Sequence, residues 1–232
     1  MSQNDELAAI QERYQRRAAV PLGRYSYFSP DVLLSAQQRQ RATLSLLSSK
    51  GIQTLRDLDL IEVGCGNGGN LLEFLLLGAT PERLAGNELL DERLRHARSV
   101  LPDAVRLWPG NAADLAIGES TFDIIYQSTV FSSILDDALQ ESMAAAMWQW
   151  LRPGGAVLWY DFTYNNPHNP DVRGVSLRRV RALFPQGRIN ARRVTLAPPL
   201  ARALVRVHPG LYGLFNSVPW LRTHILCYIE KP

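Results

Sequence analysis

The sequence predicts an α/β fold, in which a mostly parallel sheet is covered by helices on both faces. Segments typical of strands and of helices alternate from Leu58 to about Phe184, which is the pattern of such a sheet. Two short runs, 124–126 and 156–160, are apolar throughout, as expected of parallel strands that are buried on both faces. The 232 residues suffice for one sizeable core, so we expect a single domain.

Further elements are expected on either side of the alternating region. Residues 4–19 have the pattern of an amphipathic helix, and a second helix capped by Asp31 follows. Residues 192–196 and 223–229 predict the last two strands. The leucine-rich insertion between them, 197–222, indicates a helix pair packed on the sheet; a substrate lid, or a surface for a membrane or a partner, is the alternative.

The run Leu60–Asn70 is the most informative part of the chain. A short apolar strand meets three alternating glycines, Gly64, Gly66 and Gly68, and a helix is expected directly after them. Glycine lets the backbone turn sharply and lets a ligand lie against bare peptide. The start of the helix offers unpaired N–H groups and the positive end of the helix dipole. Such a turn is typical of a site for an adenosine-containing cofactor.

Two classes of cofactor fit this loop. Gly64, Gly66 and Gly69 match the dinucleotide fingerprint G-x-G-x-x-G, and Glu88 lies near the distance expected of its ribose-binding acid. This match would make the protein a nicotinamide-dependent oxidoreductase. Glu62, two residues before the first glycine, favours a different cofactor, because a carboxylate there could reach the loop or an amino-acid group of the ligand.

With Glu62 and Gly68 the loop reads E-x-G-x-G-x-G, which resembles motif I of the class I S-adenosylmethionine-dependent methyltransferases. Four further segments match motifs of this family in the same order: 83–88, 110–114, 120–126 and 151–155. The resemblance covers about residues 55–165 and departs at Asn87-Glu88, where many relatives carry Ile-Asp. It implies a Rossmann-like fold with a seven-stranded sheet, whose last strand runs antiparallel between strands five and six.

The same resemblance implies S-adenosylmethionine as the cofactor. Glu88 is expected to bind two ribose hydroxyls, and Asn111 holds a position in the adenine loop that is usually Asp or Asn. The residues expected at the cofactor site are Glu62, Gly64, Cys65, Gly66, Asn67, Gly68, Glu88, Leu89, Asn111, Ala112 and Gln127. No metal ion or disulfide framework is expected, because the two cysteines have no suitable spacing.

Catalytic candidates lie after the fifth strand of the sheet. Ligands of an open parallel sheet bind beyond the carboxyl ends of its strands, and the segment 160–174 there is dense in polar and aromatic groups. A hydroxyl acceptor must lose a proton to a base close to the methyl group. We expect His168 to be this base, with Asp161 as the second choice. Three tyrosines could cover the sulfonium with their electron-rich faces: Tyr14, Tyr25 and Tyr27.

Charge is distributed unevenly along the chain. Residues 1–164 hold 14 basic and 20 acidic side chains, whereas residues 165–232 hold 11 basic and 2 acidic ones. Most of the basic residues are arginines, which bind carboxylate or phosphate through paired hydrogen bonds. The second part therefore presents either a solvated basic surface or a site for an anionic substrate or an acidic membrane. The residues expected to bind the acceptor are Tyr164, Arg173, Arg178 and Arg179.

These observations divide the single domain 1–232 into three parts. Residues 1–50 form a helical cap, residues 55–165 the cofactor-binding core, and residues 166–232 the substrate side. No stretch has the pattern of a signal peptide or the length of a membrane span, so we expect a cytoplasmic bacterial protein. Residues 197–222 could touch the inner membrane or a glycan-assembly partner. Nucleic acid is not an expected partner, because the basic residues lack a recognition motif.

The Tyr-Asn-Asn-Pro segment 164–167 and the basic, leucine-rich tail resemble methyltransferases of bacterial surface-polysaccharide synthesis. This resemblance implies O-methylation of a sugar hydroxyl in glycan biosynthesis, on an acidic or nucleotide-linked sugar. A methyltransferase for a small lipophilic acceptor, such as a quinone, a lipid or a natural product, is the alternative. An NAD-dependent oxidoreductase and a binding module without catalysis are the more remote ones.

Overall fold

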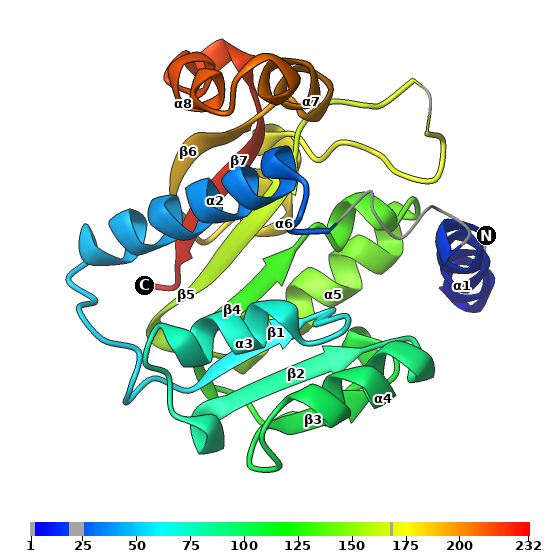
Figure 1. Ribbon diagram of the computed structural model, residues 1–232. Helices are drawn as coiled ribbons and strands as arrows, with labels where there is room; N and C mark the ends of the chain where they lie inside the picture. Colours follow the sequence, from blue (N-terminus) through cyan, green and yellow to red (C-terminus); the bar gives the residue numbers. More distant parts are fainter. Residues whose placement is uncertain (1–2, 19–25, 168) are drawn as a thin grey trace.

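A seven-stranded sheet forms the centre of the computed structural model, which describes residues 3–18, 26–167 and 169–232 (Figure 1). Its strands are β1 (Leu60–Val63), β2 (Leu84–Glu88), β3 (Arg106–Pro109), β4 (Phe122–Ser128), β5 (Leu151–Phe162), β6 (Arg188–Leu196) and β7 (Arg222–Glu230). They are arranged in the order β3-β2-β1-β4-β5-β7-β6. Strands β1 to β5 pair in parallel, and β7 runs antiparallel between β5 and β6. The expected fold class is confirmed.

Helices cover both faces of this sheet (Figure 1). They are α1 (Gln3–Ala18), α2 (Pro30–Ser48), α3 (Gly69–Leu76), α4 (Asp91–Val100), α5 (Asp137–Trp150), α6 (Leu177–Leu183), α7 (Pro198–Val207) and α8 (Gly210–Asn216). Successive strand residues point to opposite faces, so each strand supplies two cores. Ile125 and Val157 pack with α1, α5 and α6, whereas Ile124 and Leu158 pack with α2, α3 and α4.

The structure corrects the expected beginnings of two elements. The cap residue of α2 is Ser29 and not Asp31, which lies in the first turn and accepts a hydrogen bond from the Ser29 hydroxyl at 2.5 Å. A carboxylate in the first turn is favourable to the helix dipole, which explains its presence there. Strand β6 begins at Arg188, four residues before the expected strand 192–196. The sequence did not indicate its first half because these residues are largely exposed and lack the apolar run of a buried strand.

The insertion 197–222 is a helix pair, as the sequence predicts. Leu196, Ala201 and Tyr212 form a small buried cluster that packs α7 and α8 against β6 and against Leu34 of α2. The two ends of the insertion lie together, since the N–H of Ala197 donates to the carbonyl oxygen of Leu221 at 2.9 Å. None of the helices that the structure describes combines the length and the apolar character needed to cross a lipid bilayer.

Candidate active site

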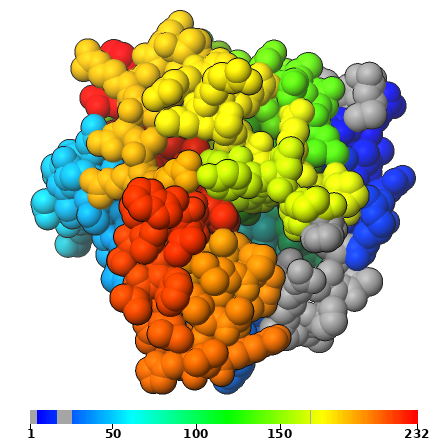
Figure 2. Space-filling model, turned by 90° about the horizontal axis from the view of Figure 1, so that it is seen from above, coloured from blue at the N-terminus to red at the C-terminus, as the bar shows by residue number. Residues whose placement is uncertain are grey.

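A cavity of about 1870 Å³ opens beyond the carboxyl ends of β1 to β5. Helix α1 covers part of it, and the first residues of α7 and β7 complete its wall. Figure 2 views the molecule from above: α7 (orange) and the segment after β5 (yellow-green) border the opening, with teal residues of the core visible between them. The first residues of β7 reach this edge of the sheet because β7 is antiparallel and therefore begins where its neighbour β5 ends.

The glycine loop after β1 has the backbone that its sequence predicts. Gly64, Gly66 and Gly68 have φ angles of +69°, +56° and +84°, in the left-handed region that side chains disfavour. A Cβ atom at Gly64 would lie 2.5 Å from Val130, whereas a Cβ at Gly66 would meet nothing closer than Arg93 Nη1 at 3.8 Å. The backbone at Gly66 therefore faces open space in the cavity, where a ligand can lie against it.

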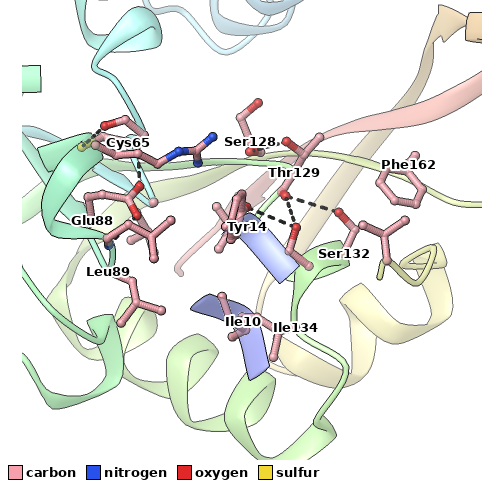
Figure 3. A pocket seen from close by; sticks show the side chains of 18 of the residues that line it. Ile10, Tyr14, Cys65, Glu88, Leu89, Ser128, Thr129, Ser132, Ile134 and Phe162 are labelled. Carbon is pink, nitrogen blue, oxygen red and sulfur yellow. Dashed lines mark hydrogen bonds between the residues drawn. The ribbon is translucent and has the colours of Figure 1, made fainter. Parts of the chain in front are cut away.

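Glu88, at the end of β2, holds this loop and faces the cavity (Figure 3). Its Oε2 accepts a hydrogen bond from Gly66 N at 2.8 Å, and its Oε1 accepts one from Leu90 N at 2.9 Å. The side chain is 5% exposed, and each oxygen keeps a lone pair for a further donor. A fixed carboxylate beside a bare glycine backbone fits the paired hydroxyls of a ribose, so these residues can hold an adenosine group.

Eight of the residues expected at the cofactor site line the cavity: Gly64, Cys65, Gly66, Asn67, Glu88, Leu89, Asn111 and Ala112. Asn111 caps the short 3₁₀ turn Ala112–Asp114, since its Oδ1 accepts from Ala113 N at 3.2 Å and its Nδ2 donates to Asp114 at 2.9 Å. Both polar ends of the Asn111 amide are thus engaged in the turn, which fixes the loop beside the site.

The other three, Glu62, Gly68 and Gln127, do not line the cavity. Glu62 is fully buried beneath the loop, where its Oε1 accepts from Asn70 at 2.6 Å, and burial raises its pKa to about 8. Asn70 in turn accepts from Arg39 at 2.8 Å. Gln127 donates to the carbonyl of β5 at Tyr160 and accepts from the segment after β4. Glu62 and Gln127 therefore position groups that line the cavity.

Helix α1 is fixed over the cavity by hydrogen bonds that its own buried ion pair makes with the segment after β4. Arg13 Nη2 lies 2.6 Å from Glu6 Oε1, and both side chains are buried. The same Glu6 oxygen accepts from Leu135 N at 2.7 Å, and Arg13 donates to the carbonyl of Ser133 at 3.3 Å. Leu135 N and Ser133 O both belong to the segment after β4, so α1 is held across the carboxyl end of that strand.

Of the three tyrosines proposed to cover the cofactor, Tyr14 on α1 lines the cavity. Its hydroxyl donates to Ser133 Oγ at 3.3 Å, and the guanidinium of Arg93 on α4 lies 4.5 Å from its ring centre. Figure 3 shows Tyr14 between Glu88 and the segment after β4. Tyr27 is 62% exposed and does not line the cavity, and Tyr25 lies outside the described residues.

The turn after β4 contains a residue that the sequence did not single out. Thr129 has a φ of +57°, which is rare for a β-branched residue. Its hydroxyl donates to Ser128 O at 2.7 Å, and its carbonyl accepts the hydroxyls of Ser132 and Ser133 (Figure 3). Strained backbone of this kind is often found at functional sites. Here it places Ser128, Thr129 and Val130 in the cavity wall.

The two candidate bases differ in what the structure describes of them. Asp161 is fully buried in β5 and does not line the cavity. It accepts hydrogen bonds from Ser132 N at 3.1 Å and Phe162 N at 2.9 Å, and burial raises its pKa to about 7. Asp161 thereby joins the end of β5 to the segment after β4. His168 lies outside the described residues, so its role stays a prediction.

Among the residues expected to bind the acceptor, only Tyr164 lines the cavity. Arg173 forms an ion pair with Asp137 of α5, and Arg179 pairs with Glu141 at 2.9 Å on the same helix. Neither of these arginines lines the cavity, and nor does Arg178. Arg178 and Arg179 lie on α6, which packs on the α5 side of the sheet, and the ion pair with Asp137 holds Arg173 on the same side.

Several basic residues that line the cavity were not expected from the sequence, and two of them, His224 at the start of β7 and Arg202 on α7, lie late in the chain. Both belong to segments that follow β6, where no motif of the resemblance extends. The signal for His224 was the antiparallel direction of the last strand, which brings its first residues to the same edge as the carboxyl ends of the parallel strands.

A family of methyltransferase domains matches residues 60–155, which comprise the glycine loop, Glu88 and the strands β1 to β4 with the start of β5. The domain match and the fold together place the chain among the class I S-adenosylmethionine-dependent methyltransferases. S-adenosylmethionine is the cofactor of this class, and the geometry at Gly66 and Glu88 fits its adenosine part. The expectations for class and cofactor are confirmed.

Part of the chain is similar in sequence to a curated protein. Over 113 residues the chain is 34% identical to dTDP-3-amino-3,4,6-trideoxy-alpha-D-glucopyranose N,N-dimethyltransferase of Streptomyces venezuelae. The match spans 45% of this chain and 44% of that protein, so it covers less than half the length of the relative.

Solved structures share the fold at low sequence identity. 1,6-Didemethyltoxoflavin-N1-methyltransferase of Burkholderia thailandensis is 17% identical with a TM-score of 0.64, over 100% of this chain and 92% of that chain. Geranyl diphosphate C-methyltransferase of Streptomyces coelicolor is 16% identical with a TM-score of 0.61, over 93% and 88%. Both of these structures contain S-adenosylhomocysteine.

Proposed function

We propose that the chain transfers a methyl group from S-adenosylmethionine to a hydroxyl group of a sugar in bacterial glycan biosynthesis. The observation that carries this proposal is the composition of the cavity. One end has the glycine loop and Glu88, and the other has the polar groups of Tyr164, Asn165 and His224. The curated relative supports a sugar acceptor, because its name describes the methylation of a nucleotide-linked sugar.

When bound, S-adenosylmethionine supplies an activated methyl group. The residues of the chain bind and orient the reactants, which is the main requirement of an in-line transfer. Glu88 and the backbone of Gly66 would hold the ribose. Tyr14 and the apolar residues of α1 would exclude water from the transferring group. Thr129, in its fixed turn after β4, would form the wall between the two ligands.

The proton of the acceptor hydroxyl needs a base, and we propose His168 for this role. An imidazole has an ordinary pKa near 6.5, so it accepts a proton at neutral pH without special tuning. Asp161 would contribute by position, because its carboxylate joins the end of β5, which precedes the segment of His168, to the segment after β4. Three further expectations stay part of this proposal. They are the division of the chain into cap, core and substrate side, a cytoplasmic location, and contacts of residues 197–222 with a membrane or a partner.

Methylation of an amino group is a second candidate, favoured by the name of the Streptomyces venezuelae relative. A neutral amine is nucleophilic before it loses a proton, so its methylation depends less on a base than that of a hydroxyl group. A small lipophilic acceptor would use the leucine-rich insertion as a wall of the cavity.

The test is incubation of the purified chain with methyl-labelled S-adenosylmethionine and three matched sets of acceptors: neutral and acidic sugar nucleotides, amino-sugar nucleotides, and quinones. Mass spectrometry locates the label. Label on a sugar oxygen supports the proposal, and label on nitrogen supports the second candidate. Label on the lipophilic set alone contradicts both. Gly66→Val is the control for dependence on the cofactor site.

A further inference from the structure

The two ends of the cavity differ in charge. The acidic side chains among the described residues of its wall, Glu88, Asp91 and Glu92, all belong to the segment from β2 into α4. The opposite end has no acidic side chain among the residues that the structure describes; we call it the acceptor end: Tyr164, Asn165, Pro198, Arg202, Thr223 and His224. A group that binds there therefore meets positive charge that no carboxylate of the wall offsets.

Arg202 is the source of this charge. It is half-buried on α7, and within the described parts of the chain its guanidinium has neither an ion pair nor a hydrogen bond. Arg39, which also lines the cavity, is by contrast paired with Glu73 at 3.1 Å. Partial burial of an uncompensated charge is unfavourable, and the guanidinium offers five donors in a planar arrangement that matches phosphate and carboxylate.

His224 adds a fixed polar group to the same end of the cavity. Its ring stacks on Tyr160 with 5.0 Å between ring centres and 14° between planes, and it meets the edge of Phe162 at 6.0 Å. Nδ1 lies 3.1 Å from Thr223 Oγ1, so Nε2 is the nitrogen left for a ligand. Burial lowers the pKa of His224 to about 4, which keeps the ring neutral at neutral pH. A neutral His224 needs no carboxylate partner in order to offer Nε2 to a ligand.

Two further features favour a large anionic ligand. The cavity of about 1870 Å³ exceeds the roughly 300–1,000 Å³ of a typical small-molecule site, so it has room for a second sizeable ligand next to the cofactor. Residues 197–199, at the beginning of α7, also form part of the acceptor end. The positive end of this helix dipole therefore lies beside Arg202 and adds to the attraction for an anion.

We propose that the acceptor end is a phosphate subsite, in which Arg202 pairs with the diphosphate of a nucleotide-activated sugar and His224 hydrogen-bonds to the same acceptor. This inference rests on the proposed function, since it names the class of sugar that the site accepts. Under this proposal the acceptor is recognised by residues that follow β6, and not by Arg173, Arg178 and Arg179 as the sequence indicated.

The experiment measures binding without turnover. Protein saturated with S-adenosylhomocysteine is titrated calorimetrically with uridine diphosphate, inorganic pyrophosphate and glucuronate at low salt. We expect both diphosphates to bind, with affinities that fall as salt is raised. Arg202→Gln should weaken both by about tenfold to a hundredfold, because it removes charge-assisted hydrogen bonds. His224→Asn should weaken uridine diphosphate less.

Arg206→Gln is the matched control, since Arg206 lies one turn further on the same helix, is exposed and does not line the cavity. It should leave every affinity unchanged, and the affinity for S-adenosylhomocysteine should stay the same in all variants. Equal affinities of Arg202→Gln and wild type overturn the subsite, as does preference for glucuronate over the diphosphates. If diphosphates bind through Arg202 but no sugar is methylated, the proposed function fails and the subsite stands.

Discussion

The two ends of the cavity are built in different ways. At the cofactor end, Gly66, Glu88 and Asn111 follow consecutive strands and are fixed by hydrogen bonds to neighbouring backbone. At the acceptor end, the wall combines segments that lie far apart along the chain, and Arg202 has no partner in the described structure. A site whose groups fix one another can be shared by a whole family. Side chains without such mutual hydrogen bonds can differ between members, and we propose that they set the specificity of each.

The largest expected effect tests whether proton removal belongs to the acceptor end. His168→Ala should lower turnover by about a hundredfold to ten-thousandfold, the usual cost of losing a positioned base. The affinity for S-adenosylhomocysteine should be unchanged. In wild type the rate should rise with pH through the titration of the histidine. Asp161→Asn is the companion variant; near-normal turnover in both would leave alignment as the source of the rate.

The next effect concerns the cofactor end. Gly66→Val should weaken S-adenosylhomocysteine by more than a hundredfold, because the side chain enters the space that faces the ligand. The left-handed φ also costs about 1–3 kcal/mol of stability. Gly51→Val is a matched control, since Gly51 has a φ of +80° and open space around it but does not line the cavity. If calorimetry finds equal affinities for both variants, the glycine loop does not contact the cofactor and serves only as a turn.

Glu88→Ala should have a smaller but clear effect on the same end. Two ribose hydroxyls donating to one carboxylate form charge-assisted bonds, so the loss should be about 1.5–3 kcal/mol of binding free energy. Part of this loss comes from the loop, because Gly66 N also loses its acceptor. A folded variant with the affinity of wild type would remove Glu88 from the site.

Glu62 gives a prediction about stability. Its pKa in the folded state is raised to about 8, above the ordinary value near 4.5, so the folded protein holds a proton that the unfolded chain releases in this window. The stability that this bound proton contributes to the folded state is fully present below pH 4.5 and is lost as the pH rises through 8. Urea unfolding should show Glu62→Gln gaining at least about 1 kcal/mol relative to wild type between pH 5 and pH 8. A difference that does not change with pH would contradict a protonated Glu62.

The smallest effect should come from the arginines on the α5 side. Arg173→Ala and the double variant of Arg178 and Arg179 should change the Michaelis constant of the acceptor less than Arg202→Gln does, and leave cofactor affinity near its original value. The carboxylates that pair with Arg173 and Arg179 are exposed, so each ion pair contributes about 1 kcal/mol or less to stability. A larger loss of acceptor affinity in these variants would return recognition to the region that the sequence first indicated.

The same contrast explains what the sequence could predict. The cofactor end depends on short runs after consecutive strands, so local patterns such as 62–68 and Glu88 located it. Glu62 and Gln127 were expected at the ligand because a motif does not tell which of its side chains lie beneath the loop. Arg202 and His224 could not be found in this way. Their position depends on the direction of β7 and on the packing of α7, which are properties of the assembled sheet.

The insertion between β6 and β7 leaves and re-enters the sheet at the same point, where Ala197 and Leu221 are joined by a backbone hydrogen bond. The β6–β7 pairing uses Arg188–Leu196 and Arg222–Glu230, so no pair of this ladder comes from the residues in between. For protein engineering, residues 198–220 are therefore a segment that can be exchanged as a unit. Helix pairs from other methyltransferases could be inserted there to redirect the enzyme to new acceptors, while the cofactor-binding residues stay unchanged.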